Sequence, residues 1–169
     1  MRTARGSELR DAFDREFAAT PRPAEPSHRD FLCIRVGGEP SAIPLDDIAS
    51  LHADLRVVAL PSRAPELLGV AAIRAAIVPI YDLGFAFGMS RADVPRWTVV
   101  LRDGAAGFAF EGYDGHARIP DRAIAAASQR RHTIGQFSAG GQPRSIIDLG
   151  TVLAAIENRR NPGGPGKEP

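Results

Sequence analysis

The sequence repeats one pattern of strand and turn signals at a nearly fixed interval, and this repeat restricts the folds available to the chain. Gly37 with Ala42-Ile43 returns 67 positions later as Gly104 with Ala109-Phe110. The run from Ile80 to Gly84 (IYDLG) returns 66 positions later as Ile146 to Gly150 (IIDLG). Two matches at almost one interval indicate a duplicated β unit of roughly 65 residues. Each unit is predicted to form a small barrel or curled sheet, too small to enclose a ligand cavity.

Each unit carries the signature of a β-hairpin. Apolar residues alternate through Phe31 to Val36, and Gly37-Gly38 supplies a turn before a strand at Ser41 to Leu45. In the second unit, the apolar and β-branched run Thr98 to Arg102 precedes the turn Asp103-Gly104, which favours a hairpin. The chain is therefore predicted to be mainly β.

Residues 145 to 157 close the second unit and are predicted to end in a helix. Asp148 or Thr151 is placed to cap its first turn. The spacing turns four apolar side chains inward: Leu149, Val152, Leu153 and Ile156. Asp82 holds the equivalent place in the first unit. Because Asp82 and Asp148 both precede Leu-Gly, capping is favoured over a pair of catalytic carboxylates.

Turn and proline signals divide the chain into three regions. Residues 1–30 are predicted to be an extension, with a short helix whose apolar stripe is Leu9, Phe13 and Phe17 and a proline-rich linker over residues 20–30. Residues 31–160 form the folded part, with subdomains at about 31–90 and 97–157 whose edges could be exchanged. Residues 161–169 hold three glycines and three prolines, which predicts a disordered tail.

The charge pattern argues against nucleic acid and membrane as partners. The 21 basic residues balance 20 acidic residues and form no dense basic cluster, which a polyanion surface would require. The most apolar window, residues 69–89, is interrupted by Arg74 and Asp82, so no direct membrane insertion is expected. The single cysteine, Cys33, cannot form an internal disulfide. A cytoplasmic, soluble protein is predicted.

The sequence lacks the local signatures of catalysis and of metal or cofactor binding. The four histidines (His28, His52, His116 and His132) lie far apart, without the short spacing of a local metal site. Cys33 is interpreted as a small buried hydrophobe on a strand rather than a nucleophile. We therefore expect no metal, no cofactor and no catalytic residues.

Arg74 stands alone in the apolar run from Gly69 to Ile80. A guanidinium group is costly to bury without a partner. Two interpretations remain open: Arg74 points to solvent at the edge of a sheet, or it lies at a seam between the units and pairs with a carboxylate or carbonyl groups.

The run from Leu60 to Leu83 resembles the signature of the CheW-type chemotaxis coupling proteins. It keeps the prolines of that signature together with Gly69, Arg74, Val78-Pro79 and Asp82-Leu83. The likeness extends upstream over residues 31–51 and, less closely, downstream over residues 98–156.

The resemblance implies a tandem of two five-stranded, SH3-like β-barrels with short helices and no catalytic activity. Such proteins bridge the cytoplasmic tip of a methyl-accepting chemoreceptor to the regulatory domain of a CheA-type histidine kinase, beneath membrane-bound receptor arrays. The receptor tip is a helical hairpin, and it lies in an apolar groove between the barrels. By motif register, the groove positions are Leu45, Ile48, Ser50 and Val99, and Arg74 braces the groove. The alternative interpretation of Leu45, Ile48 and Val99 is that they are plain core residues.

The chain departs from the family pattern near the expected groove. Ser50 replaces the glutamate that would pair with Arg74, and Ala72 and Ala75 replace an asparagine and a glycine. Ala75 would strain the backbone if its position requires positive φ. These changes keep two further hypotheses open: an adaptor of a non-flagellar chemosensory system, or one that binds kinase without receptor. A small nucleic-acid-binding barrel is a weaker alternative.

Overall fold

The computed structural model describes residues 27–89, 95–127 and 130–160. The expected helix over Leu9 to Phe17 and the expected tail at 161–169 lie outside the described residues, as does most of the linker. The first strand begins at His28, so the last three residues of the expected linker belong to the folded part.

Ten strands account for most of the described residues, in agreement with the predicted mainly β class. They are β1 (His28–Val36), β2 (Glu39–Pro44), β3 (Ile48–Ala53), β4 (Leu67–Ile73), β5 (Ala76–Asp82), β6 (Trp97–Leu101), β7 (Gly107–Phe110), β8 (Gly112–Pro120), β9 (Thr133–Ala139) and β10 (Gln142–Ile147). The helical elements are short: η1 (Leu45–Asp47), α2 (Leu83–Ala86), η2 (Asp121–Ala123) and α3 (Leu149–Arg160).

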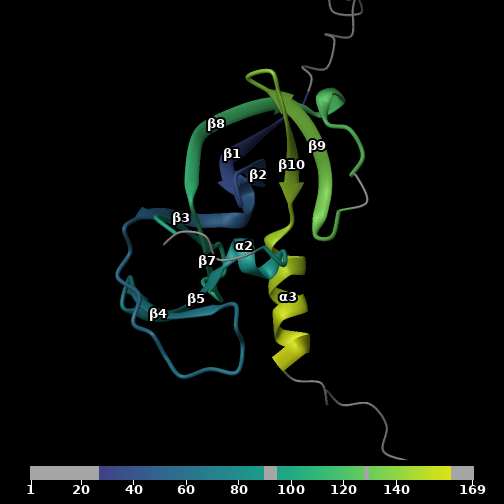
Figure 1. The fold of residues 1–169 in the computed structure, drawn as a ribbon. Helices are drawn as coiled ribbons and strands as arrows, with labels where there is room; N and C mark the ends of the chain where they lie inside the picture. The colour runs from purple at the N-terminus through teal and green to yellow at the C-terminus, as the bar shows by residue number, and fades with distance from the viewer. Residues whose placement is uncertain (1–26, 90–94, 128–129, 161–169) are drawn as a thin grey trace, which may run out of the picture.

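The strands form two five-stranded sheets, which we call sheet 1 and sheet 2. Sheet 1 has the order β8-β1-β2-β10-β9, and sheet 2 has the order β3-β6-β7-β5-β4. Figure 1 shows β8, β9 and β10 curving around β1 and β2 in one half of the molecule, with β3, β4, β5 and β7 in the other. This is the pair of five-stranded, barrel-like units expected from the resemblance.

The two sheets exchange strands between the repeated units. The first unit contributes β1 and β2 to sheet 1 but β3, β4 and β5 to sheet 2, and the second unit divides in the reverse manner. A parallel pair joins the units in each sheet: Ile146 lies opposite Ala42, and Asp82 lies opposite Ala109. The sheets therefore do not follow the sequence division at about 31–90 and 97–157. The exchange involves central pairings as well as edges.

Three apolar clusters hold this arrangement together. One lies in sheet 1 and contains Phe31, Cys33 and Phe137, and a second lies in sheet 2 and contains Ile73, Val78, Ile80 and Val100. The third and largest, which we call the shared core, takes residues from both sheets and from α3. Its fully buried members include Ile34 and Ile43 of sheet 1 and Val99 and Phe108 of sheet 2. The two sheets thus pack as one hydrophobic unit.

Both predicted helix caps are confirmed. The Asp82 side chain accepts a hydrogen bond from the Phe85 N–H (3.0 Å) at the start of α2, and Asp148 accepts one from the Thr151 N–H (3.0 Å) in α3. Three of the four α3 residues expected to face inward (Leu149, Val152 and Ile156) are buried, and Leu153 packs partly buried against the shared core.

Candidate functional site

The crossing from sheet 1 to sheet 2 brings Leu45 to the edge of the shared core. β2 ends at Pro44, and η1 (Leu45–Asp47) leads directly into β3. Arg102, just beyond β6, fixes this crossing: its side chain donates to the carbonyl groups of Leu45 (3.2 Å) and Asp46, and its backbone N–H donates to the Asp47 carbonyl (2.9 Å). Leu45 is half-buried, so part of its side chain remains available at the surface.

The structure places the three apolar positions of the expected groove in one cluster. Leu45, Ile48 and Val99 all belong to or pack against the shared core. Their exposure differs, because Ile48 is 8% exposed whereas Val99 is completely buried. Val99 therefore lies beneath the surface, opposite Leu51 in the β3–β6 ladder. Only Leu45 and the edge of Ile48 can touch another protein without rearrangement.

Ser50 lies beside these positions but already has a partner. The register of β3 against β6 shifts between Ile48 and Ser50. As a result Ala49 is exposed, and Ser50 is half-buried and pairs with Val100 of β6. The Ser50 hydroxyl lies 2.8 Å from Nε2 of His52, within hydrogen-bond distance. At position 50 this chain therefore has a serine hydroxyl paired with the His52 imidazole, whereas the family pattern has a glutamate carboxylate.

Arg74 occupies the tip of the β4–β5 hairpin and is exposed. Ile73 pairs with Ala76, so Arg74 and Ala75 form a two-residue turn, with φ angles of 48° and 64°. Both residues are in the left-handed region, and the strain expected at Ala75 is therefore present. Within the part of the chain that the structure describes, no carboxylate or carbonyl pairs with Arg74, so the solvent-facing interpretation fits its position.

One surface was not anticipated from the sequence: the outer face of the β4–β5 hairpin, made of Val58, Val70, Ala72, Ile77 and Pro79. Val70 pairs with Pro79, Ala72 pairs with Ile77, and Val58 forms a bridge to Val70. Ile77 is 70% exposed and Val58 is 55% exposed. The intervening residues Ala71, Ile73, Val78 and Ile80 face the core. Strands with apolar residues on both faces could have revealed this surface in the sequence.

The equivalent face of the other hairpin is more polar, although Ile134 is 50% exposed on it. Shifting by the 66-residue repeat places Gln136, Ser138 and Pro143 of β9 and β10 at the positions of Val70, Ala72 and Ile77. The pairing is also conserved, because Pro143 lies opposite Ser138 as Ile77 lies opposite Ala72. The apolar outer face is thus specific to one hairpin and is not required by the fold.

The histidines of the described residues do not converge on one site, and the His52 imidazole lies within hydrogen-bond distance of the Ser50 hydroxyl. His116 is paired with Asp30 (2.9 Å), and His132 lies 3.2 Å from the Thr151 hydroxyl, so the histidines are dispersed. Burial raises the pKa of the Cys33 thiol, which keeps it protonated as a small hydrophobe. No group of three or more metal-ligating side chains lies together within residues 27–89, 95–127 and 130–160.

A buried arginine is the main electrostatic feature of sheet 1. Arg144 donates to the Asp114 carboxylate (2.8 Å) and to the Ile34 carbonyl (3.2 Å), while Arg35 approaches the other Asp114 oxygen (3.0 Å). Burial alone would raise the pKa of Asp114, but hydrogen bonds from Arg144 and Arg35 hold it below its ordinary value. This network ties β8 to β1 and β10.

Comparison with known proteins assigns the family. The model of the CheW-like domain matches residues 30–157. The chain belongs to the CheW-like domain family. It is a noncatalytic CheW-like scaffold of chemotaxis signalling, as the resemblance implied, and this assignment argues against the nucleic-acid-binding alternative.

A solved structure supports the fold of this CheW-like domain. The crystal structure of the scaffolding protein TtCheW from Thermoanaerobacter tengcongensis is similar, with a TM-score of 0.66 and 15% sequence identity, and the match covers 73% of this chain and 90% of that chain. A search of curated proteins finds no match. None of the described helices has the length and apolar character needed to traverse a bilayer.

Proposed function

We propose that this CheW-like domain couples the cytoplasmic tip of a methyl-accepting chemoreceptor to the regulatory domain of a CheA-type histidine kinase, in the cytoplasm beneath receptor arrays. A coupling protein must hold two partners at once, which requires two separate surfaces. The observation that carries the proposal is the exposed apolar outer face of the β4–β5 hairpin, which is separate from the sheet crossing where Leu45 remains partly accessible beside the exposed Asp46 and Asp47.

The crossing is the proposed receptor surface. A helix that presents apolar side chains every three to four residues binds best in a groove lined by aliphatic groups. Leu45 and Ile48 provide the accessible wall, while Val99 supports them from the core and Ser50 lies at the side. Burial of this wall contributes about 25 cal/mol per Å² of apolar area removed from water.

The outer face of the β4–β5 hairpin is the proposed kinase surface. A pleated face with Ile77 and Val58 largely exposed is better suited to the wall of another small barrel than to a single helix. The more polar equivalent face on β9 and β10 supports this assignment, since a continuous apolar exposed face is disfavoured unless a partner covers it.

Arg74 extends the proposed kinase surface at the tip of the same hairpin. Its expected role was to brace the groove through a carboxylate, yet no acidic side chain pairs with it among the described residues. We therefore place the acidic partner of Arg74 on the protein that binds this hairpin, where a guanidinium–carboxylate pair would fix orientation.

Pull-down experiments with a receptor-tip fragment and a kinase regulatory-domain fragment test both assignments. We expect Leu45→Asp to lose receptor capture and keep kinase capture, because it places a charge in the proposed groove. Ile77→Asp is expected to do the reverse. The control is Ile134→Asp on β9, which charges a side chain that is 50% exposed on the other sheet and should leave both captures unchanged.

The same experiment decides against the proposal if either variant loses both partners while its circular dichroism spectrum and melting temperature remain native. Ile48→Asp is less suitable as the primary variant, because a carboxylate at a side chain only 8% exposed would destabilise the fold.

A second candidate function is an adaptor that binds kinase without receptor. The observation that favours it is the Ser50–His52 pair in place of the family carboxylate. It predicts that the unaltered chain captures the kinase fragment but not the receptor fragment, and that Ser50→Glu gains receptor capture.

A further inference from the structure

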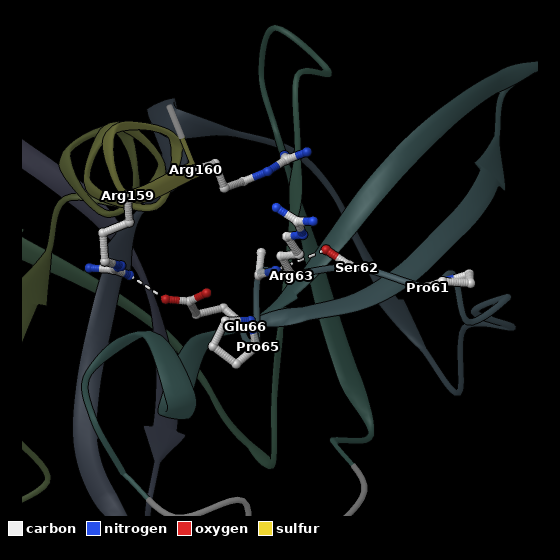
Figure 2. Close-up of a pocket in the computed structure, with 8 residues that line it drawn as sticks. Pro61, Ser62, Arg63, Pro65, Glu66, Arg159 and Arg160 are labelled. Carbon is white, nitrogen blue, oxygen red and sulfur yellow. Dashed lines mark hydrogen bonds and ion pairs between the residues drawn. The ribbon is translucent and has the colours of Figure 1, made fainter. Parts of the chain in front are cut away.

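A hollow of about 650 Å³ lies between the segment 61–66 and the last two residues of α3, Arg159 and Arg160. Figure 2 shows that Arg63, Arg159, Arg160 and Glu66 all project into this region. Three arginines and one carboxylate therefore line the hollow. The hollow is separate from the sheet crossing and from the outer face of the β4–β5 hairpin, so it has no place in the coupling function proposed above.

The single carboxylate is already neutralised. Glu66 is 6% exposed, and one of its oxygens accepts a hydrogen bond from Nη2 of Arg159 at 2.5 Å. This pair connects the 61–66 segment to the end of α3. It leaves the charges of Arg63 and Arg160 uncompensated within the hollow.

The remaining two arginines are arranged to receive an anion. Nη1 of Arg160 donates to the hydroxyl of Tyr81 (3.2 Å), a side chain that is almost completely buried and therefore fixed. Arg63 has no ion-pair or hydrogen-bond partner among residues 27–89, 95–127 and 130–160. In Figure 2 the guanidinium ends of Arg63 and Arg160 extend toward the same space. Both arginines line the hollow, and positive charges that share a site repel each other unless an anion compensates them.

The loop that carries Arg63 is also preorganised. Pro61 and Pro65 restrict its backbone, and the Ser62 Oγ accepts a hydrogen bond from the Ala64 N–H at 3.0 Å. Because that oxygen acts as the acceptor, the Ser62 hydroxyl hydrogen is available to donate to a ligand. A loop already held in place loses less conformational entropy when a ligand binds.

We propose that this hollow is a binding site for a phosphate group, with Arg63 and Arg160 as the charged donors and Ser62 as a neutral donor. A phosphate monoester carries a charge near −2 at neutral pH and accepts several hydrogen bonds, which matches two guanidinium groups that have no carboxylate partner among the described residues. The bound group links the 61–66 loop to α3 across the Glu66–Arg159 pair, so its binding stabilises the folded chain.

The test measures binding of inorganic phosphate to the full chain by calorimetry and by the shift in melting temperature, with sodium chloride at matched ionic strength as reference. We expect saturable binding and a higher melting temperature in phosphate only. Arg63→Ala and Arg160→Ala should each weaken binding by about tenfold or more, the size expected for loss of one charge-assisted hydrogen bond. The matched control, Arg118→Ala, removes an exposed arginine from β8 of the other sheet and should bind as the unaltered chain does.

Glu66→Gln provides an independent test, because it removes the negative charge and releases Arg159. We expect it to bind phosphate more tightly than the unaltered chain. Comparison of phosphate with a phosphoserine peptide identifies the source of the group: equal affinity indicates a free phosphate, and higher affinity for the peptide indicates a modified protein. Equal responses to phosphate and chloride, or equal weakening by Arg118→Ala and Arg63→Ala, would overturn the proposal.

Discussion

The β4–β5 and β9–β10 hairpins occupy equivalent places in the two sheets, yet their outer faces differ in polarity. Both have an inward apolar row and a two-residue left-handed turn, and both lead into a helix capped by aspartate. The β4–β5 hairpin has an apolar outer face, whereas the outer face of the β9–β10 hairpin carries Gln136 and Ser138 together with a single exposed aliphatic side chain, Ile134. Duplication has preserved the pairing geometry and left the outer faces free to diverge, which is why we assign the partner surface to only one hairpin.

The largest difference lies in the helices that follow. α2 has four residues and α3 has twelve, although both begin with Asp-Leu-Gly. α3 continues because Val152 and Ile156 reach the shared core. We expect Ile156→Ala, which creates a cavity at a fully buried site, to lower the free energy of unfolding by about 3 kcal/mol. Chemical denaturation measures this.

The exposed Ala154→Ser in the same helix serves as the control and should change the stability by less than about 0.5 kcal/mol. A similar loss for both variants would show that helix propensity, rather than packing against the shared core, maintains α3.

The inward rows differ by one charge, because Arg144 in β10 stands where β5 has Val78. The carboxylate that pairs with Arg144 belongs to Asp114. Asp114→Ala removes it and leaves the Arg144 side chain, which is only 8% exposed, without a counter-charge. We expect a loss of about 3 kcal/mol in the free energy of unfolding. The double variant Asp114→Ala with Arg144→Val removes both charges, gives position 144 the side chain of its equivalent Val78, and should recover most of that loss. Additive losses in a double-mutant cycle would contradict this account.

The same network gives the stability a defined dependence on pH. The pKa of Asp114 is lower in the folded chain than in the unfolded chain, so the unfolded state binds the proton more readily. Its contribution is fully present above the unfolded pKa of about 3.9 and is lost as the pH falls through the folded value. We expect urea denaturation from pH 6 to pH 2 to show a shallower decline in stability for Asp114→Asn than for the unaltered chain.

The aspartate caps of α2 and α3 are equivalent in the two units, and removing one of them should have a smaller effect on stability. Asp148→Ala removes the acceptor for the Thr151 N–H and should lower the free energy of unfolding by about 1 kcal/mol. Asp148→Asn keeps an acceptor and should retain most of the stability. The pKa of Asp47 is raised mainly by burial and also by the negative charge of Asp148, and Asp148→Asn removes that charge. Equal losses for the two variants would show that the carboxylate acts through its charge rather than as a cap.

The turns provide the smallest expected effect, with the opposite sign. Arg74 and Ala75 have φ angles of 48° and 64°, and the equivalent residues Gly140 and Gly141 have 60° and 74°. A side chain in this region costs about 1–2 kcal/mol, partly offset by the greater freedom of glycine in the unfolded chain. Ala75→Gly should therefore raise the stability by about 0.5 kcal/mol. Gly141→Ala should lower it, and thermal melts of both variants measure the difference.

Local signals predicted much of the fold. The β1–β2 and β6–β7 hairpins, both aspartate caps and the inward face of α3 followed from turn residues and apolar spacing. The extent of the strand exchange did not follow, because Ile146 carries no local mark that distinguishes a partner in its own unit from Ala42 in the other unit. Similar repeats contain similar strand patterns, and tertiary packing decides between the pairings.

The candidate site was predictable to a lesser degree. Register with the family pattern named Leu45, Ile48 and Val99, which the structure brings into one cluster, but alternation alone did not indicate that Val99 would be completely buried while Leu45 remained half-exposed. The outer face of the β4–β5 hairpin was obscured because apolar residues fill both faces of β4 and β5. The phosphate hollow could not be foreseen, since Arg63 and Arg160 meet only after α3 has packed against the sheets.

The reciprocal exchange of strands also affects how the chain is made. Sheet 1 requires β10, which is synthesised after the other nine described strands, to pair in parallel with β2 near the beginning of the described residues. The amino-terminal half therefore cannot complete either barrel during synthesis, and its unpaired strand edges must wait for residues about a hundred positions downstream. Such distant pairings slow folding. Two separately produced fragments divided between β5 and β6 should assemble into one native molecule, although neither fragment can fold alone.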